Sequence, residues 1–579
     1  MFFPILFDSH GSLRRTEGHL SGWNLFISGG NKPDMITLKK WIGQHRRVTG
    51  DIVALMAGLL MPFGFAPFGW YVLTVVALAL LFPVLISVSP ARAFWRGWIF
   101  GLAMFGLGVF WIHESFKFAA VALPLAILST GALIAFLATY PALFGSSMAF
   151  LSRKSMARRS SPSPTILPPW RSLPAGFLLL ALPAGWILQE WVRGWFLGGF
   201  SWLEIGYAHM DSPLAGLAPL LGAYGVGWAA AVSAGIVLLA FRSGMRNGRS
   251  TVTTRVAGLS VLLALGGGIW GGSAWLDGMT WVRPIGAPIR VALIQGNVPQ
   301  EEKWLPSRRG PTLYRYLSLT RQAKQSDLVI WPETALPGYY HEFKRFIAGL
   351  RGEFHAHGMD ILLGAPVLEK ESQRYFNSVV AITDVGEAFY HKRHLVPFGE
   401  YLPMAGILRG ILDFLMIPMS DFSTGPPLQT PLHVAGQTIG VSVCYEASFG
   451  RDIIASLPQA TLLVNVSNDA WFGDSSGPHQ NLQMARMRAR ESGRYLLRGT
   501  NTGISAIIDP RGRIMGRAPQ FREFALTGAV IGMSGATPYV RYGNRIVVSA
   551  VLIALIIGMS ISRVVGNRVK VVYGGNDRV

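Results

Sequence analysis

The stretch IVALMAGLLMPFGFAPFGWYVLTVVALALLFPVLISVSPA, residues 52–91, contains no Asp, Glu, Lys or Arg. A membrane-spanning helix needs about 20 apolar residues, so this stretch is long enough for two such helices. The cluster Pro62-Phe63-Gly64-Phe65-Ala66-Pro67 lies inside it, and Pro and Gly interrupt helices. The sequence therefore predicts two membrane helices joined by a tight turn.

Uncharged runs continue along the chain. They are Gly97–His113, Phe118–Leu151, Ser172–Gln189, Ser212–Phe241, Val256–Leu276 and Ile546–Ser562. With the first pair they predict about eight spans: seven in a membrane domain, residues 51–276, and the eighth in residues 541–563. Charged residues form 14% of the 579 residues, against about 25% in soluble proteins, which argues against a purely soluble protein.

Lys and Arg gather in alternate segments between these runs. Residues 1–50 carry seven of them. The second loop between the predicted spans and the C-terminal tail, residues 564–579, are basic as well. By the positive-inside rule both termini are predicted to be cytoplasmic, with residues 1–50 as an N-terminal extension. This topology accounts for most of the net charge of +21. No basic stripe with interleaved aromatic residues is present, so we expect no nucleic-acid partner.

Residues 277–540 differ in composition from the rest of the chain, because charged residues return there. Short apolar runs alternate with helical patterns, and we expect strands at Arg290–Gln295, Asp327–Trp331, Ile361–Gly364, Ser378–Thr383, Gly440–Val443, Thr461–Val466 and Ser505–Asp509. Nearly continuous apolar strands indicate a sheet buried on both faces. An α/β domain on the outer side of the membrane follows from this pattern and the topology.

The only cysteine, Cys444, follows one of these strands, so disulfides within the chain and multi-cysteine metal sites are excluded. Ligands of α/β sheets bind at the carboxyl ends of the strands, where a turn would present this sulfur. A buried structural thiol is the alternative. A thiol with a pKa near 8.5 needs a base or a neighbouring cation to react at neutral pH.

Two further segments carry such groups. Glu333, in Trp331-Pro-Glu333, could accept the thiol proton, with helix capping as the alternative. Lys392, in Lys392-Arg-His-Leu-Val-Pro-Phe-Gly-Glu400, could stabilise a thiolate and an oxyanion, with a solvated surface charge as the alternative. Ser/His/Asp catalysis, for which His394 and His479 are present, is the less attractive alternative.

The three segments, in this order, resemble the Glu-Lys-Cys triad of the nitrilase superfamily. The flanking apolar runs and the segments Gln295–Trp304, Asn468–Gly473 and Gln483–Ala489 narrow the resemblance to its membrane-bound branch, the apolipoprotein N-acyltransferases. The resemblance covers roughly residues 50–563 and implies a nitrilase-like αββα sandwich on an eight-helix membrane base. It implies nothing about the first ~48 residues.

The resemblance also implies an activity. A fatty acyl chain passes from a phospholipid, with phosphatidylethanolamine as the expected donor, through a thioester on Cys444 to the α-amine of the S-diacylglyceryl cysteine of an apolipoprotein. It implies no cofactor and no metal, and it implies the bacterial inner membrane with the catalytic domain in the periplasm. A membrane-tethered amidase or nitrilase would use the same triad, releasing its acyl group to water. A transporter or sensor would carry paired intramembrane charges, which these runs lack.

The resemblance assigns supporting roles to five more residues. It implies that Trp304 gates the substrate, that Asn377 assists near the oxyanion, and that Glu400, Tyr445 and Glu446 shape the pocket. Glu400 and Glu446 could instead be structural carboxylates that orient Lys392.

Two apolar segments suggest contact with lipid. Residues 401–418 are inserted between catalytic segments and crowded with Leu, Ile, Met and Phe, which favours a lid on the bilayer over a core helix. The aromatic segment Trp191–Tyr207 is predicted to form an interfacial belt, with ordinary packing as the alternative.

Overall fold

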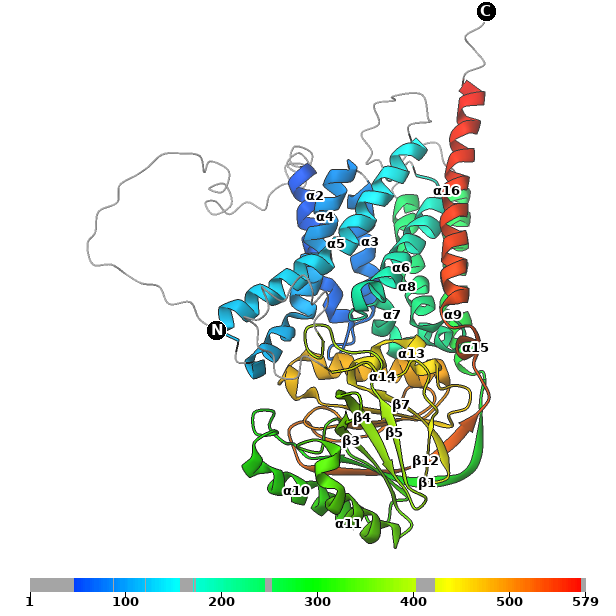
Figure 1. The fold of residues 1–579 in the computed structure, drawn as a ribbon. Helices are drawn as coiled ribbons and strands as arrows, with labels where there is room; N and C mark the ends of the chain where they lie inside the picture. Colours follow the sequence, from blue (N-terminus) through cyan, green and yellow to red (C-terminus); the bar gives the residue numbers. More distant parts are fainter. Residues whose placement is uncertain are drawn as a thin grey trace, which may run out of the picture. The chain divides into compact units, whose positions relative to one another are not determined.

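The computed structural model describes residues 46–86, 88–119, 121–156, 170, 173–244, 252–401 and 422–573. Apolar helices form one part of it (Figure 1). Their bounds are α2 Arg46–Leu60, α3 Val72–Ile86, α4 Pro90–Gly108, α5 Leu123–Met156, α6 Leu182–Arg193, α7 Ile205–Ala208, α8 Ala218–Gly244, α9 Val252–Asp277 and α16 Arg545–Tyr573. A helix lies over each uncharged run, and the predicted turn at 62–67 falls between α2 and α3.

The prediction of about eight membrane spans is not confirmed. By length and apolar composition, four helices of the described residues could cross a membrane, and a fifth if the bent pair Pro90–Gly108 and Phe110–Phe118 is counted as one span. The apolar helix α3, Val72–Ile86, is shorter, and so is the searched part of α16, Arg545–Ile561. α3 begins only after the Pro62 to Pro67 cluster, and a π-helical turn, Phe177–Ala181, precedes α6.

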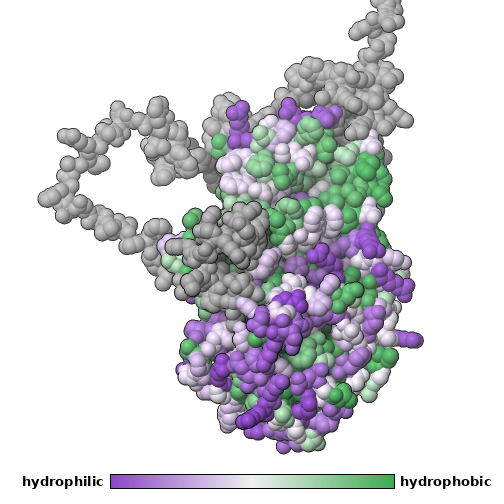
Figure 2. Space-filling view, viewed as in Figure 1, coloured by the Kyte–Doolittle hydropathy of each residue, from purple (hydrophilic) through white to green (hydrophobic). Residues whose placement is uncertain are grey.

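The outward side chains of these helices are largely apolar. Leu128, Val261, Leu263 and Ile556 are more than half exposed, and Figure 2 shows hydrophobic residues gathered over the helices. Exposed apolar surface of this extent is costly in water but favourable against lipid. These helices are therefore built for a membrane.

The α/β part contains two six-stranded sheets. Their orders are β12-β1-β2-β3-β4-β5 and β11-β10-β9-β8-β7-β6, and the three middle strands β1, β2, β3 and β7, β8, β9 are parallel in each. The first sheet comprises β1 Arg283–Gln295, β2 Leu328–Ile330, β3 Asp360–Glu369, β4 Arg374–Ile382, β5 Glu387–His391 and β12 Phe524–Ser534. The second comprises β6 Leu432–Val434, β7 Gln437–Val443, β8 Leu462–Ser467, β9 Leu496–Thr500, β10 Ala506–Ile508 and β11 Ile514–Arg517.

Side chains alternate between the two faces of each strand and so form the apolar layers of the α/β part. Val291 and Leu293 of β1 pack with Val441 and Val464 of the second sheet, whereas the intervening Ala292 faces the helices α10 (Arg309–Gln322) and α11 (Lys344–His355). The outer face of the second sheet is covered by α13 (Gly450–Ile454) and α14 (Ser476–Ser492). Because side chains alternate between the faces of a strand, each sheet contributes to two apolar layers. The result is the expected αββα sandwich.

Each predicted strand of the α/β part overlaps an observed one, and the apolar runs are buried on both faces. The strands β5, β6, β9, β11 and β12 were not predicted. They include short or edge strands with mixed exposure, such as β11 with an alternating pattern, which carry a weaker sequence signal.

Side chains of α14 join the two parts. Arg486 pairs with Asp211, Arg490 pairs with Asp277, and the carboxylate of Glu491 accepts a hydrogen bond from the backbone N–H of Ala223 at 2.7 Å. α14 also packs on the second sheet. It is therefore in contact with both the helices and the sandwich.

Candidate active site

The residues of the expected triad lie at the carboxyl ends of three strands. Glu333 follows β2, Lys392 follows β5 and Cys444 follows β7. The first two belong to one sheet and the cysteine belongs to the other, so the two sheets together form the site.

Glu333 is held by hydrogen bonds to both of its carboxylate oxygens. Oε1 accepts from the side-chain amide of Asn377 at 2.7 Å, and Oε2 accepts from the backbone N–H of Asn468 at 2.8 Å. The side chain is buried, with 7% exposed. The carboxylate is therefore fixed in position before any substrate arrives, as a general base requires.

Lys392 lies between two carboxylates. Its Nζ is 2.7 Å from Glu400 Oε2 and 3.7 Å from Glu333 Oε1. Burial by itself lowers the pKa of Lys392, but Glu400, Glu333 and Cys444 outweigh burial and raise it above its usual value. The side chain is therefore an ammonium at neutral pH, available to stabilise negative charge.

Asn377, on β4, connects the two carboxylates. Its Nδ2 donates to Glu333 Oε1 at 2.7 Å and to Glu400 Oε1 at 2.9 Å. Both amide hydrogens are thereby used, so in this state Asn377 aligns the carboxylates around Lys392.

Cys444 is the first residue of the short turn η10, Cys444–Ser448, and has a φ of +49°. A non-glycine residue in this left-handed region is strained, and such strain is frequent at functional sites. Burial and then the Glu333 carboxylate raise the pKa of the thiol to about 12, while Lys392 opposes that shift. The resting sulfur is therefore protonated and needs a base to become a nucleophile.

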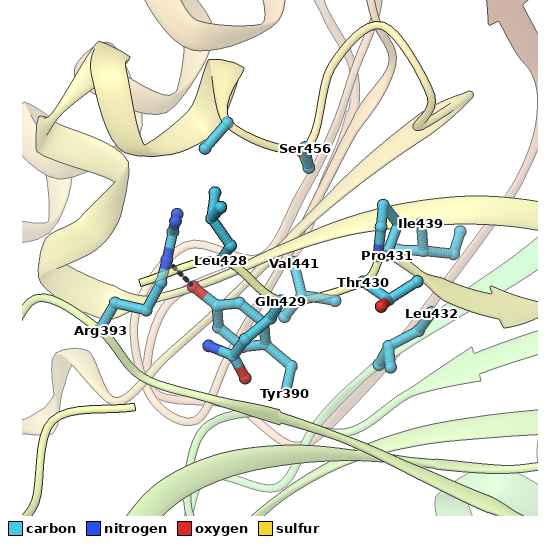
Figure 3. A pocket seen from close by; sticks show the side chains of 11 residues that line it. Tyr390, Arg393, Leu428, Gln429, Thr430, Pro431, Leu432, Ile439, Val441 and Ser456 are labelled. Carbon is cyan, nitrogen blue, oxygen red and sulfur yellow. Dashed lines mark hydrogen bonds between the residues drawn. The ribbon is translucent and has the colours of Figure 1, made fainter. Parts of the chain in front are cut away.

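Glu446 holds the turn that carries Cys444. Its carboxylate accepts from the backbone N–H groups of Val443 and Arg393 at 2.7 Å, and from the hydroxyl of Tyr390 at 3.0 Å. Figure 3 shows Arg393 donating in turn to the Tyr390 hydroxyl, beside a hollow that none of the triad residues lines. Burial raises the pKa of Glu446, and its backbone donors oppose that shift. Glu446 thus links the two sheets next to the cysteine turn. Glu400, by contrast, contacts Lys392.

Tyr445 connects the catalytic turn to the aromatic segment Trp191–Tyr207. Its hydroxyl donates to the backbone oxygen of Gly199 at 2.6 Å, and its ring stacks on Trp202 with centroids 5.6 Å apart. Trp202 and Tyr207 are buried, so these two rings pack inside the protein and do not form an interfacial belt. Trp195 and Phe196, by contrast, are 43% and 45% exposed. Only the exposed rings of this segment are available to lipid.

Several polar residues of the site carry no signal of their own in the sequence. Asn468 and Asn501 join the segment after β8 to the segment after β9 through a 3.1 Å hydrogen bond. Asp469 and Arg498 form a fully buried ion pair at 2.9 Å, and Ser467 donates to Asp469 at 2.7 Å. Asn468 and Asp469 lie in one of the segments that carry the family resemblance, and that resemblance is the sequence signal that could have identified them.

Trp304 is half-buried in the segment that follows β1, and its neighbour Lys303 is buried with 3% exposed. Lys303 was not predicted as a site residue. Its ammonium contacts the turn that carries Glu333, as described below. Among the described residues no group of three His, Cys, Asp or Glu side chains could hold a metal ion.

Two family models match this chain. Residues 290–539 match the carbon-nitrogen hydrolase model, and residues 57–236 match the model of the apolipoprotein N-acyltransferase N-terminal domain. The apolipoprotein N-acyltransferase of Methylococcus capsulatus is 42% identical over 501 residues, which cover 85% of this chain and 92% of the relative. That of Azotobacter vinelandii is 40% identical, covering 85% and 91%.

The chain belongs to the apolipoprotein N-acyltransferase family. This membership agrees with a chain that combines apolar helices and a carbon-nitrogen hydrolase domain. Among solved structures, Nit3 of Saccharomyces cerevisiae, from the nitrilase superfamily, is 19% identical with a TM-score of 0.33, covering 44% of this chain and 92% of Nit3.

Proposed function

We propose that this protein N-acylates lipoproteins through an acyl-enzyme on Cys444. The observation that carries the proposal is the placement of a buried thiol, a fixed carboxylate and a buried ammonium at the shared edge of the two sheets, in a chain of this family. No residue outside this group is needed to supply the nucleophile, the base or the oxyanion partner.

In the first half-reaction, Glu333 accepts the thiol proton and the sulfur attacks an ester carbonyl of a phospholipid. Lys392 stabilises the oxyanion of the tetrahedral intermediate. The carbon–oxygen bond then breaks, Glu333 returns the proton to the leaving alkoxide, and a lysophospholipid departs. A thioester remains on Cys444.

In the second half-reaction, the α-amine of an S-diacylglyceryl cysteine attacks the thioester. Glu333 accepts a proton from the amine, the carbon–sulfur bond breaks, and the thiolate is reprotonated. The sum is the exchange of an ester for an amide, and ping-pong kinetics follow from the covalent intermediate.

The supporting residues act on this machinery. Glu400 and Asn377 hold Lys392 and Glu333 near the oxyanion, Glu446 fixes the cysteine turn, and Tyr445 shapes the pocket against the aromatic segment. Trp304 gates entry of the substrate.

The membrane arrangement belongs to the same proposal. We infer about eight spans in the bacterial inner membrane, with residues 277–540 as the catalytic domain in the periplasm and with both termini in the cytoplasm. Phosphatidylethanolamine is the proposed acyl donor. The proposed lid, residues 401–418, lies outside the described residues except for Tyr401, and so do residues 1–45 of the N-terminal extension.

The test is the intact mass of the purified protein after incubation with phosphatidylethanolamine. We expect a fatty-acyl adduct that hydroxylamine removes and that an acceptor peptide with a diacylglyceryl cysteine discharges. Cys444→Ser removes the only thiol and is the matched control, in which the adduct and the transfer should both be lost. Turnover in Cys444→Ser at the wild-type rate would refute the mechanism, and release of ammonia from amides without transfer would favour the amidase.

A further inference from the structure

Lys303 is a buried ammonium group that the proposed mechanism does not use. It is 3% exposed and lies in the segment after β1, directly before Trp304. Among the described residues its Nζ forms no ion pair, and its hydrogen bonds go to a backbone oxygen and a hydroxyl. A buried cation without a close counter-ion is costly and so calls for an explanation.

The ammonium binds the turn that carries Glu333. Nζ donates to the backbone oxygen of Glu333 at 3.3 Å and to the hydroxyl of Thr334. Thr334 has a φ of +47°, which is strained for a β-branched residue. On the other side of this turn Gly364 of β3 approaches so closely that a Cβ there would lie 2.3 Å from the backbone oxygen of Pro332. The turn is thus held between β3 and Lys303.

The segment that contains Lys303 is itself anchored to the active site. The backbone N–H of Val298 donates to Asn501 Oδ1 at 2.9 Å, and Asn468 Nδ2 donates to Gln300 Oε1 at 2.7 Å. Asn468 is the residue whose backbone N–H also binds Glu333. Residues 298–303 therefore dock against the same groups that orient the base.

Trp304 follows directly after these docked residues. The Lys303 ammonium lies 5.8 Å from the centre of the Trp304 ring, within the range of a cation–π contact. One ammonium group therefore contacts both the tryptophan proposed to gate the substrate and the turn of the proposed base.

We propose that Lys303 is a positioning residue that couples the placement of Trp304 to the alignment of Glu333. When residues 300–304 are docked, the ammonium fixes the Glu333 turn. When they move away, the turn loses two hydrogen bonds and the base loses its alignment. Acyl transfer to Cys444 is thereby restricted to the state in which the gate is in place. This inference rests on the proposed function, because it assigns Glu333 and Trp304 their roles.

The charges around Lys303 make the coupling measurable. Glu333, in the turn after β2, is the charged residue that acts on the ammonium. Lys392 lies 3.7 Å from the same carboxylate, and Glu302 of the Lys303 segment pairs with Arg308. Burial lowers the pKa of Lys303 to about 8, and Glu333 opposes that shift. Lys392 and Cys444 have raised pKa values, so they do not lose protons near pH 8.

The experiment measures the rate of acyl-enzyme formation at saturating phospholipid for Lys303→Met, Lys303→Arg, Trp304→Ala and the double variant Lys303→Met/Trp304→Ala. We expect Lys303→Met to slow acylation by about 10²-fold, because a small misplacement of a catalytic group costs that much. Lys303→Arg keeps the charge and the donors, so it should restore most of the rate. The losses in the double variant should be less than multiplicative, because both changes break one connection.

The pH profile separates positioning from a merely structural role. Wild-type acylation should fall as the pH rises through about 8, when the Lys303 ammonium loses its proton. Lys303→Arg should move this fall upward by at least two pH units, since arginine stays charged. Multiplicative losses in the double variant, or an unchanged alkaline fall in Lys303→Arg, would overturn the inference.

Two controls keep the result interpretable. If Lys303→Met does not fold, Thr334→Val removes one acceptor of the ammonium at nearly constant volume and should slow acylation in the same direction. A wild-type rate in folded Thr334→Val would then count against the coupling. If Cys444→Ser still forms the adduct, the proposed function fails, whereas loss in Cys444→Ser with full activity in Lys303→Met contradicts only the coupling.

Discussion

Two groups of buried charges differ in how completely their polar atoms are bound. In the catalytic group, both carboxylate oxygens of Glu333, Glu400 and Glu446 accept hydrogen bonds. In the group where the helices meet the sandwich, Glu190, Glu204, Arg488 and Glu491, one oxygen of Glu190 and the Nε of Arg488 have no partner in the described part of the chain. The three carboxylates around the cysteine are therefore held in advance, although Asn377 Oδ1 and Arg498 Nε beside them have no partner in the described part of the chain. Of the second group, Arg488 and Glu491 join the helices to the sandwich.

The junction group still contacts the site through one connection. Arg488 donates to the Tyr207 hydroxyl at 3.2 Å, and that hydroxyl donates to the backbone oxygen of Ser448 at 3.1 Å, in the cysteine turn. The comparison therefore predicts that substitutions in the catalytic group affect the chemical rate, whereas substitutions at the junction affect stability.

The largest effect is expected from Glu333→Gln. Turnover should be lost, because the amide cannot accept the thiol proton. Labelling of Cys444 by a small alkylating reagent should rise at the same time, by about tenfold, because Glu333 raises the pKa of the thiol and a neighbouring charge shifts a pKa by about one unit or more. The measurement compares acyl transfer with the rate of alkylation between pH 7 and 9. Slower labelling in Glu333→Gln would contradict this electrostatic account.

Lys392→Met is expected to reduce acyl transfer by about 10²–10³-fold, because the oxyanion loses its partner. Alkylation of Cys444 should slow as well, since Lys392 lowers the pKa of the thiol. The two variants thus change labelling in opposite directions while both impair turnover. The melting temperature should be recorded alongside, because Met leaves the Glu400 carboxylate without its cation.

At the junction, Arg488→Met should lower the free energy of unfolding by about 3–5 kcal/mol, because it leaves the buried Glu491 carboxylate without its cation. Thermal unfolding in detergent measures the loss. Arg488→Met/Glu491→Gln is the matched control and should recover part of it. The folded fraction should retain acyl-transfer activity within a few-fold, and a loss as large as that of Lys392→Met would break the distinction between the two groups.

The smallest effect is expected from removing residues 1–34. A chain that starts at Met35 keeps Lys39, Lys40, Arg46 and Arg47 before the first uncharged run, and these four charges should hold the N-terminus inside. Topology reporters and acyl transfer should match the full chain. Stable, correctly inserted but inactive protein would show that the extension has a function.

The positions of the apolar helices and of many strands can be predicted from the sequence, because both depend on local patterns. The uncharged runs coincide with helices, and the apolar runs such as Thr461–Val466 coincide with buried strands. The pattern of charges does not give helix length: within the uncharged run of residues 52–91, α2 ends at Leu60 and α3 begins only at Val72, with the turn Met61–Gly64 between them.

The order of Glu333, Lys392 and Cys444 in the sequence suggests the chemistry proposed for them, whereas the way each is held depends on how the two sheets pack. Glu400 contacts Lys392 whereas Glu446 binds the cysteine turn, a difference that two glutamates in similar segments do not reveal. The sequence gives no role to Lys303, which becomes a buried partner of the Glu333 turn only after folding. Local patterns specify the elements, whereas hydrogen bonds between residues distant in the chain depend on how those elements pack.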